Sequence, residues 1–475
     1  MPETLKPDIC VIGGGPGGIS VATAAAAFGV PTVLIERHKM GGDRLDSGCV
    51  PSKALLAAAR RVEATRNAKM FGVEARDGRV NFPDVHRHVR AAIAAVAPSV
   101  SVERMTGLGV RVINAPAKFK DRNTVVAGDT EIRARRFVIA TGSEPALPAI
   151  PGLDSGPYLT NEGIFSLADR PEHLIVIGAG PTGLELAQGF RRLGSSVTVL
   201  EAARPLDRDD AECSAIVLAQ LEREGIVIRA GVNVVGVAHA GRTVTATIES
   251  GGAEQTITGS HLLVAAGRIP SIANLGLDVA GIRHERSGIV VNRKLKTSNR
   301  RVYAIGDCIA GTLGLTHAAN YHADLVVRNA LFRLPVRLNS DRIPWVTFTD
   351  PELAQVGLTE AQARQQGIKI RVTRLPYQEN DRAQAEGELR GHIKVITTRK
   401  GKIVGVTIVG AQAGELISMW ILAIVRNLGL RDIADLILPA PTLSEIGKRA
   451  AIDYLTPSLT GVWVRRIIGW MRIFG

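Results

Sequence analysis

The sequence is poor in cysteine and in aromatic residues. Its 475 residues include only four cysteines, and Phe, Trp and Tyr together make up 4%. The cysteines are Cys10, Cys49, Cys213 and Cys308, and no two of them have the spacing of a CxxC motif or of a metal site. This excludes a disulfide-stapled secreted domain, and we expect no metal centre. A reducing compartment, the cytoplasm, is favoured.

Long apolar runs are also lacking. The stretch from Ile19 to Ile35 is interrupted by Gly29 and Pro31, which predicts a helix followed by a strand and not a membrane span. The first residues, Met1 to Pro7, have no apolar core of a secretion signal. At this length we expect about three domains.

Acidic residues are outnumbered, 45 Asp and Glu against 58 Lys and Arg, for a formal net charge of +13. Nucleic acid or an anionic membrane would suit such a charge. Because the sequence contains no nucleic-acid-binding motif, we instead expect a basic surface around anionic cofactors and substrates, and no nucleic-acid partner.

Glycine is abundant, with 50 residues, and its first cluster follows a short apolar run. The run Asp8–Ile12 leads into Gly13, Gly15 and Gly18, which have GxGxxG spacing, and an Ala-rich segment follows. A second apolar run then ends on Glu36. Such a strand–turn–helix–strand pattern places a pyrophosphate at the helix N-terminus and a carboxylate at a ribose hydroxyl. We therefore predict a dinucleotide site here.

The same pattern occurs a second time after His173. Gly178, Gly180 and Gly183 follow an apolar run, and the next strand ends on Glu201. Two such units predict two dinucleotides. Glu201 would accept from a ribose 2′-hydroxyl and repel a 2′-phosphate, which favours NADH. Arg204, three residues later, could instead reach a 2′-phosphate, so NADPH stays open.

Between these units lies the segment GGDRLDSGCVPSK, residues 41–53. It resembles the redox segment of the class I pyridine nucleotide-disulfide oxidoreductases, which include dihydrolipoamide dehydrogenase, glutathione reductase and mercuric reductase. That family has the pattern GGxCxxxGC[VI]PSK, with two cysteines. Cys49 matches the second cysteine, but Arg44 stands where the first is expected. Since a disulfide needs two cysteines within bridging distance, ordinary dithiol–disulfide exchange is not expected.

The resemblance covers most of the chain and implies its architecture. An α/β fold is implied, with an FAD-binding Rossmann-like domain interrupted by an NAD(P)-binding one, and an α+β C-terminal domain that forms a homodimer. The expected boundaries are 1–148 and 269–340 for FAD, 149–268 for NAD(P), 341–458 for dimerisation and 459–475 for a basic tail. The implied cofactors are FAD and NADH or NADPH.

The resemblance also implies site residues. Lys53 and Glu185 would form an ion pair near the flavin N5, beside Cys49. Gly267 would contact the nicotinamide nucleotide. The further residues implied to contact FAD, besides Gly13, Gly15, Gly18 and Glu36, are Gly42, Lys53, Ala117, Thr141, Gly142, Asp307, Thr316 and His317.

One further departure from the family lies near the C-terminus. The family has HAHPTLSE where this chain has LPAPTLSE, residues 438–445. The second His is the acid/base group contributed across the dimer, and Ala440 occupies that position. Glu445 is retained, although the task implied for it is to orient the missing His.

The tail from Leu459 to Gly475 combines arginines with two tryptophans. This pattern predicts a short basic amphipathic helix. Such a helix either lies on a membrane surface or packs its apolar face on the dimer or on its own chain. Its apolar residues are Val462, Trp463, Ile467, Ile468, Trp470, Met471 and Phe474.

Three functions are compatible with these residues. The first is an FAD enzyme that passes hydride from NAD(P)H to a non-disulfide acceptor such as a quinone, peripheral to the inner face of a membrane. The second is a single-cysteine disulfide or peroxide reductase that uses Cys49. The third is a non-catalytic flavoprotein that binds a partner. The intact second dinucleotide pattern argues against the third.

Overall fold

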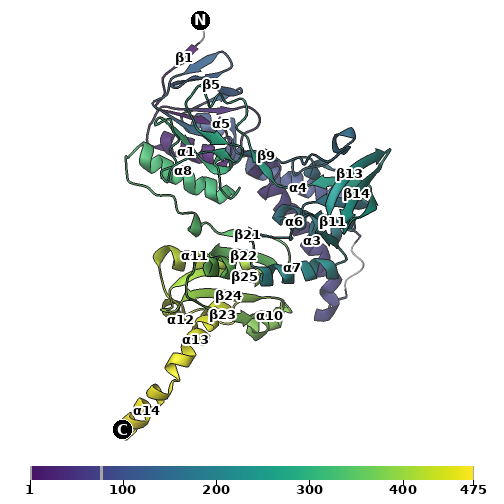
Figure 1. The fold of residues 1–475 in the computed structure, drawn as a ribbon, viewed down its shortest axis with the longest axis vertical. Helices are drawn as coiled ribbons and strands as arrows, with labels where there is room; N and C mark the ends of the chain where they lie inside the picture. The colour runs from purple at the N-terminus through teal and green to yellow at the C-terminus, as the bar shows by residue number, and fades with distance from the viewer. Residues whose placement is uncertain (1–2, 75–78, 474–475) are drawn as a thin grey trace. The chain divides into compact units, whose positions relative to one another are not determined.

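A parallel sheet of five strands, in the order β20-β8-β2-β3-β4, carries the first glycine-rich turn. The computed structural model describes residues 3–74 and 79–473 (Figure 1). Strand β20 follows β8 by more than 160 residues, so two separate stretches of chain build this sheet. The elements are β2 (Ile9–Ile12), β3 (Thr32–Glu36), β4 (Val110–Asn114), β8 (Arg136–Ile139), β20 (Val302–Ala304), α1 (Pro16–Ala27) and α8 (Thr316–Ala330).

The strands are short and almost wholly apolar because both faces of a parallel sheet are covered. Ile9, Leu34 and Phe137 are completely buried. At Gly18, a Cβ atom would lie 1.9 Å from the carbonyl oxygen of Gly13, so only glycine lets α1 pack this closely on the turn.

A second parallel sheet, in the order β12-β11-β10-β16, repeats the arrangement. At Gly183, a Cβ atom would lie 2.0 Å from the Gly178 carbonyl oxygen, so glycine is required here for the same reason as at Gly18. An antiparallel sheet of three strands, β13-β14-β15, is inserted before β16. The elements are β10 (His173–Ile177), α6 (Pro181–Arg192), β11 (Ser196–Glu201), β12 (Val227–Ala230), β13 (Asn233–Ala240), β14 (Thr243–Ser250), β15 (Ala253–Gly259) and β16 (His261–Val264).

The redox segment lies in two helices, α2 (Asp43–Asp46) and α3 (Cys49–Asn67). Helix α3 packs against α6 and against α4 (Phe82–Val96). A separate helix, α5 (Val102–Gly107), begins after Ser101, whose hydroxyl accepts a hydrogen bond from the Arg104 N–H and caps the helix.

Smaller strands complete this part of the chain. A four-stranded sheet has the order β1-β7-β6-β5. Two further sheets have two strands each: β9 pairs with β17, and β18 pairs with β19. Their bounds are β1 (Glu3–Leu5), β5 (Ala117–Asp121), β6 (Thr124–Ala127), β7 (Thr130–Ile132), β9 (Ser143–Pro145), β17 (Arg268–Pro270), β18 (His284–Glu285) and β19 (Gly288–Ile289).

The C-terminal part forms an antiparallel sheet in the order β21-β22-β25-β24-β23. Helix α11 packs on β22 and β25. The elements are β21 (Trp345–Thr347), β22 (Glu352–Gly357), α9 (Glu360–Gln365), β23 (Ile370–Pro376), α10 (Asp381–Glu386), β24 (His392–Thr398), β25 (Ile403–Gly410), α11 (Ala413–Arg426), α12 (Leu430–Ala434) and α13 (Glu445–Leu459). The predicted fold class, two Rossmann-like domains and an α+β domain, is therefore confirmed.

The chain divides into two compact units. The first comprises Met1–Ala202 and Val227–Ser340, and the second comprises Ala203–Ile226 and Asp341–Gly475. Helix α7 (Ala211–Arg223) thus belongs with the C-terminal sheet, where it packs on β22 and β25. The domain boundaries drawn from the sequence stay a prediction.

The tail forms the helix α14 (Val462–Met471), which follows α13 (Figure 1). None of its residues is buried, and Trp463 is 75% exposed. Phe474, counted in the predicted apolar face, lies outside the described residues. Among the helices that the structure describes, none has both the length and the apolar character to cross a membrane.

Candidate functional site

A cavity of about 630 Å³ opens beside the first glycine-rich turn. Gly13, Glu36, Ala117 and Thr141 all line it, from four separate stretches of the first unit. The Glu36 carboxylate accepts hydrogen bonds from the Gly14 N–H at 2.6 Å and the His38 N–H at 2.8 Å, which fixes it at the end of β3. These residues fit the adenosine side of a dinucleotide.

The turn itself leaves room for a pyrophosphate. A Cβ atom on Gly15 would meet no atom within 4 Å, so open space lies beside the N-terminus of α1. A Cβ atom on Gly42 would lie 3.0 Å from the Gly15 Cα, which shows how closely the redox segment approaches this turn. Gly142 has a φ of +69° and likewise faces open space.

A chain of hydrogen bonds connects Asp307 to the redox segment. Its carboxylate accepts from the Ser143 hydroxyl at 2.8 Å, and Ser143 accepts from the Arg268 guanidinium at 2.7 Å. Arg268 also forms an ion pair with Asp43, at the start of α2. Burial raises the pKa of Asp307, while the Ser143 hydrogen bond and the Arg268 charge oppose that rise.

His322 is a buried residue that supports the turn containing Asp307. It is 2% exposed, and its Nδ1 accepts a hydrogen bond from the Gly306 N–H at 3.2 Å. Burial lowers the pKa of His322 to about 4, so the ring is neutral near neutral pH. A neutral ring can accept at Nδ1, which protonation would prevent.

Cys49 is the first residue of α3 and is exposed. Its Sγ lies 3.4 Å from the Thr316 hydroxyl, at the start of α8, and His317 is the next residue of that helix. One turn along α3, the Lys53 ammonium donates to the Glu185 carboxylate at 2.8 Å. The redox segment, α6 and α8 therefore meet at one place, as expected for a flavin site.

Arg44 lies in α2 and is half-buried. Its side chain makes no hydrogen bond or ion pair within the described part of the chain. The other cysteines, Cys10, Cys213 and Cys308, are all buried, and all four are free thiols. Burial raises the pKa of Cys308 to about 11, so this thiol is protonated near neutral pH.

The second glycine-rich turn repeats the geometry of the first. Glu201 accepts a hydrogen bond from the Ala179 N–H at 2.7 Å, at the same 22-residue separation as Glu36 and Gly14. A Cβ atom on Gly180 would meet nothing within 4 Å, and neither would one on Gly267, whose φ is +113°. This turn also fits a dinucleotide pyrophosphate.

Glu445 is in the second unit, at the start of α13. Its carboxylate accepts a hydrogen bond from the Thr442 N–H at 3.0 Å. It thus caps the turn that contains Ala440. Alanine carries no titratable group. The turn therefore offers no acid or base at the position where the family resemblance implies His.

The residues that connect these parts were not predicted from the sequence. They are Ser143, Arg268, Asp43 and His322. No local signal marks them, because Arg268 and Asp43 are 225 residues apart in the chain.

Comparison with known proteins agrees with this geometry. Residues 7–323 match the model of the pyridine nucleotide-disulphide oxidoreductase family, and residues 343–451 match the dimerisation domain of that family. The mercuric reductase of Staphylococcus aureus is 32% identical over 450 residues, which are 94% of this chain and 82% of that protein. The dihydrolipoyl dehydrogenase of Geobacillus stearothermophilus is 32% identical over 455 residues, 94% of this chain and 96% of that protein.

Solved structures of similar proteins include LpdA from Mycobacterium tuberculosis. It has a TM-score of 0.86 and 26% identity, with coverage of 95% of this chain and 99% of that one. A Cu(II) complex of RclA, the HOCl-induced flavoprotein disulfide reductase of Escherichia coli, has a TM-score of 0.83 and 26% identity, covering 94% and 99%. Together with the two nucleotide-binding turns, these matches show that the chain belongs to the class I pyridine nucleotide-disulphide oxidoreductase family and is an FAD-dependent NAD(P)H oxidoreductase with a dimerisation domain.

Proposed function

We propose that this enzyme passes hydride from NADH, through FAD, to an acceptor that is not a disulfide, with a quinone as the best candidate. The observation that carries the proposal is the lone thiol at the redox segment. Cys49 has Arg44 in the place of its expected partner, and the other three cysteines are buried. A quinone needs no protein thiol to accept electrons.

We propose that the first half of the reaction, hydride transfer from NADH to FAD, uses the ion pair of Lys53 and Glu185. When bound, FAD supplies a two-electron carrier that accepts hydride. Lys53 and Glu185 form their ion pair between α3 and α6, and we propose that Lys53 holds positive charge beside the flavin N5. Glu185 is buried, and its charge keeps the lysine in one orientation.

The proposed cofactor contacts follow the two turns. For FAD they are Gly13, Gly15, Gly18, Glu36, Gly42, Ala117, Thr141, Gly142, Asp307, Thr316 and His317, and for the nicotinamide nucleotide they are Gly178, Gly180, Gly183, Glu201 and Gly267. NADH is preferred because Glu201 would repel a 2′-phosphate. Arg204 donates to the carbonyl oxygens of Asp207 at 2.6 Å and Asp209 at 3.2 Å, and these bonds hold its guanidinium in its own loop.

The tail supports a quinone as acceptor. Helix α14 exposes Trp463, Ile467 and Trp470 by half or more of their surface. The Arg466 guanidinium lies 5.6 Å from the centre of the Trp463 ring. Aromatic and basic residues on one exposed helix suit an anionic membrane surface, and quinones dissolve in the apolar interior of such a membrane. We propose that the homodimer binds the inner face of the membrane peripherally through α14.

Liposome sedimentation tests the tail. The protein should sediment with vesicles of phosphatidylcholine and phosphatidylglycerol, and less with phosphatidylcholine alone. The double variant Trp463→Ser/Trp470→Ser should stay in solution. Equal binding of the variant would contradict a role for α14.

A second candidate, a thiol-dependent reductase, has one observation in its favour. Cys49 is exposed and lies beside the Thr316 hydroxyl, so a substrate could reach it. The experiment that separates the two is turnover of Cys49→Ser with NADH and menadione. The proposed function predicts menadione turnover within about twofold of the parent protein, whereas a thiol reductase would reduce a disulfide or a peroxide in the parent protein and lose that activity in Cys49→Ser. Ser52→Ala, one turn along α3, is the control for disturbance of the helix.

A further inference from the structure

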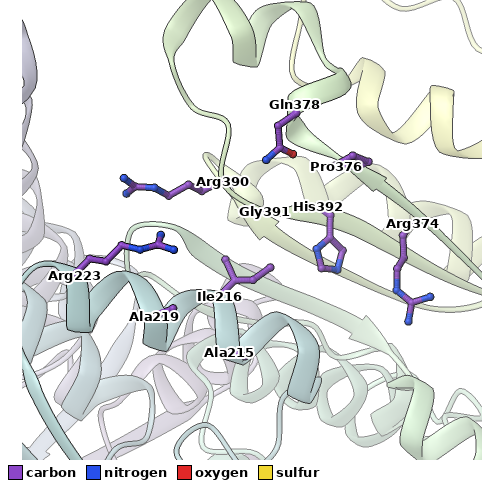
Figure 2. A pocket seen from close by; sticks show the side chains of 10 residues that line it. All are labelled: Ala215, Ile216, Ala219, Arg223, Arg374, Pro376, Gln378, Arg390, Gly391 and His392. Atoms are coloured by element: carbon purple, nitrogen blue, oxygen red, sulfur yellow. The ribbon is translucent and has the colours of Figure 1, made fainter. Parts of the chain in front are cut away.

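The second unit contains a pocket of about 570 Å³ that none of the nucleotide sites uses. One wall is helix α7, which presents Ala215, Ile216 and Ala219. The facing wall comes from β23 and the start of β24, including Pro376 (Figure 2). These four side chains are apolar, so the floor of the pocket favours a hydrocarbon or aryl group over water.

Arginines stand at both ends of this apolar floor. Arg223 and Arg390 lie at one end, on opposite walls, and Arg374 lies at the other (Figure 2). Arg223 is in the last turn of α7, and Arg390 precedes β24. None of the ten lining residues, all of them in the described part of the chain, is acidic.

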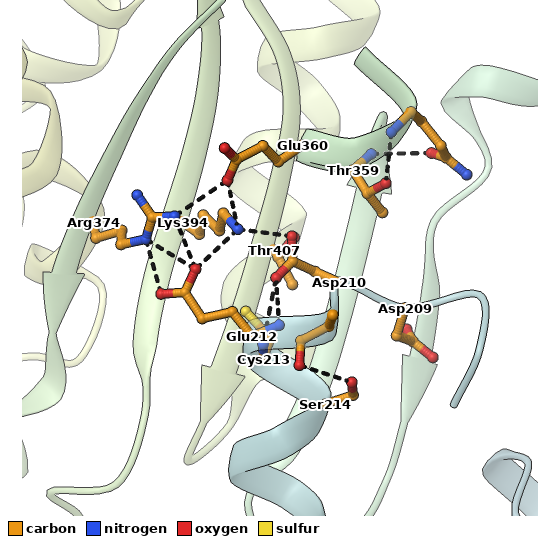
Figure 3. A network of polar contacts seen from close by, with 12 residues as sticks. Asp209, Asp210, Glu212, Cys213, Ser214, Thr359, Glu360, Arg374, Lys394 and Thr407 are labelled. Carbon is orange, nitrogen blue, oxygen red and sulfur yellow. Dashed lines mark hydrogen bonds and ion pairs between the residues drawn. The ribbon is translucent and has the colours of Figure 1, made fainter. Parts of the chain in front are cut away.

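The charge at the Arg374 end is already neutralised. Its guanidinium binds Glu212 through three hydrogen bonds of 2.8 to 3.0 Å, and it also binds Glu360 at 3.2 Å (Figure 3). His392 adds no charge near neutral pH because burial lowers its pKa. The uncompensated charge of the pocket is therefore at its other end.

Arg223 and Arg390 differ from Arg374 in their contacts. Both are exposed, and neither makes a hydrogen bond or an ion pair with any residue that the structure describes. Two guanidinium groups at one end of a pocket repel each other and are stabilised by an anion placed between them.

The walls of the pocket are fixed in position. Lys394 is 4% exposed along its side chain and contacts three carboxylates, Asp210 at 2.8 Å, Glu212 at 3.0 Å and Glu360 at 2.8 Å (Figure 3). Burial alone would lower the pKa of Lys394, but these hydrogen bonds raise it overall. Asp210 also caps α7 by accepting from the Glu212 and Cys213 N–H groups. The network therefore ties the start of α7 to the sheet and keeps the pocket open.

We propose that this pocket binds an amphipathic anion, with a carboxylate or phosphate head between Arg223 and Arg390 and an apolar body along Ile216, Ala219 and Pro376. The charged head would bind at the arginine end, and the chain would extend toward the neutral end. A fatty acid and an alkyl phosphate share this chemistry.

Titration calorimetry of the full-length holoenzyme tests the proposal with four probes used below their micelle concentrations. Decanoate and decyl phosphate should both bind, and the tighter of the two identifies the preferred head group. Decanol lacks the charge and acetate lacks the apolar body, so each should bind at least tenfold more weakly. Decanol binding as tightly as decanoate would overturn the proposal.

Substituted proteins show where decanoate binds. Arg223→Ala/Arg390→Ala should weaken decanoate binding at least tenfold, whereas Arg286→Ala, an exposed arginine in the turn between β18 and β19, should leave it unchanged. The Trp463→Ser/Trp470→Ser variant should bind as the parent does, because α14 contributes no residue to the pocket. Decanoate binding that persists in the arginine double variant, or that is lost with the tryptophans, would contradict the assigned site.

Discussion

The Lys53 ammonium lies 2.8 Å from the Glu185 carboxylate and joins α3 to α6, one turn from the start of each helix. The two helices come from different nucleotide-binding halves of the chain, so the pair holds the redox segment against the second dinucleotide unit. Lys53 is 38% exposed along its side chain, whereas Glu185 is 7% exposed. The carboxylate therefore positions the lysine from inside the protein.

Substitution of either member of this pair should slow flavin reduction. We expect Lys53→Met and Glu185→Gln each to lower the rate at least tenfold in stopped-flow mixing with NADH, because each removes a charge that orients or stabilises the other. The double variant should be no slower than the slower single variant, since both act through one ion pair. Lys69→Met, an exposed lysine beyond the end of α3, is the control. Rate losses that multiply in the double variant would show that the two residues act independently.

Retention of FAD should depend on the hydrogen-bond chain that ends at Asp307. Asp307→Ala should lose most of its FAD on desalting, and Ser143→Ala should lose less, because Ser143 supports Asp307 and is not itself the proposed ligand. The ratio of absorbance at the flavin band to that of the protein measures this loss. Asp129→Ala, in an exposed turn, should keep its flavin. Full retention by Asp307→Ala would remove Asp307 from the proposed site.

Selectivity for NADH should depend on Glu201. The Glu201→Ala variant should lower kcat/KM for NADH about tenfold, because it removes the acceptor proposed for the ribose hydroxyls. It should change kcat/KM for NADPH little or raise it, since the repulsion of the 2′-phosphate is lost as well. Steady-state kinetics with both nucleotides give the comparison. An equal decrease for the two would indicate general damage to the turn.

The free energy of unfolding should fall at acidic pH, and His322 should account for part of this fall. Its pKa is lowered from 6.5 to about 4 by burial, so between these values the unfolded chain binds a proton that the native protein does not. The free energy of unfolding therefore falls as the pH falls from 6.5 to 4. In His322→Gln this dependence should be shallower, by about 1.4 kcal/mol per pH unit at most. Urea unfolding of the holoenzyme across this range measures the slope, and identical slopes would exclude the histidine.

The nucleotide-binding turns could be predicted from the sequence because their determinants are local. A turn, its helix and the carboxylate that closes the unit all lie within about thirty residues, and both turns place an N–H group on a carboxylate 22 residues later.

Contacts over long sequence distances could not be predicted in this way. The hydrogen-bond chain from Asp307 through Ser143 and Arg268 to Asp43 joins four stretches of sequence, and no one of these residues is distinctive by itself. The grouping of α7 with the C-terminal sheet depends on the buried charge of Lys394 meeting carboxylates more than 180 residues away. Neither arrangement leaves a periodic pattern in the sequence.

The most direct test of the proposed function is an anaerobic titration of the FAD-loaded protein with NADH, followed by visible absorbance. A single redox-active centre predicts complete loss of the flavin band at one equivalent of NADH, with no new band at long wavelength. The control is Arg44→Cys, which restores a second cysteine to the redox segment and should take up a second equivalent. If the parent protein itself needs two equivalents, or stops at a long-wavelength band, Cys49 takes part in electron transfer and the proposed thiol-independent function is wrong.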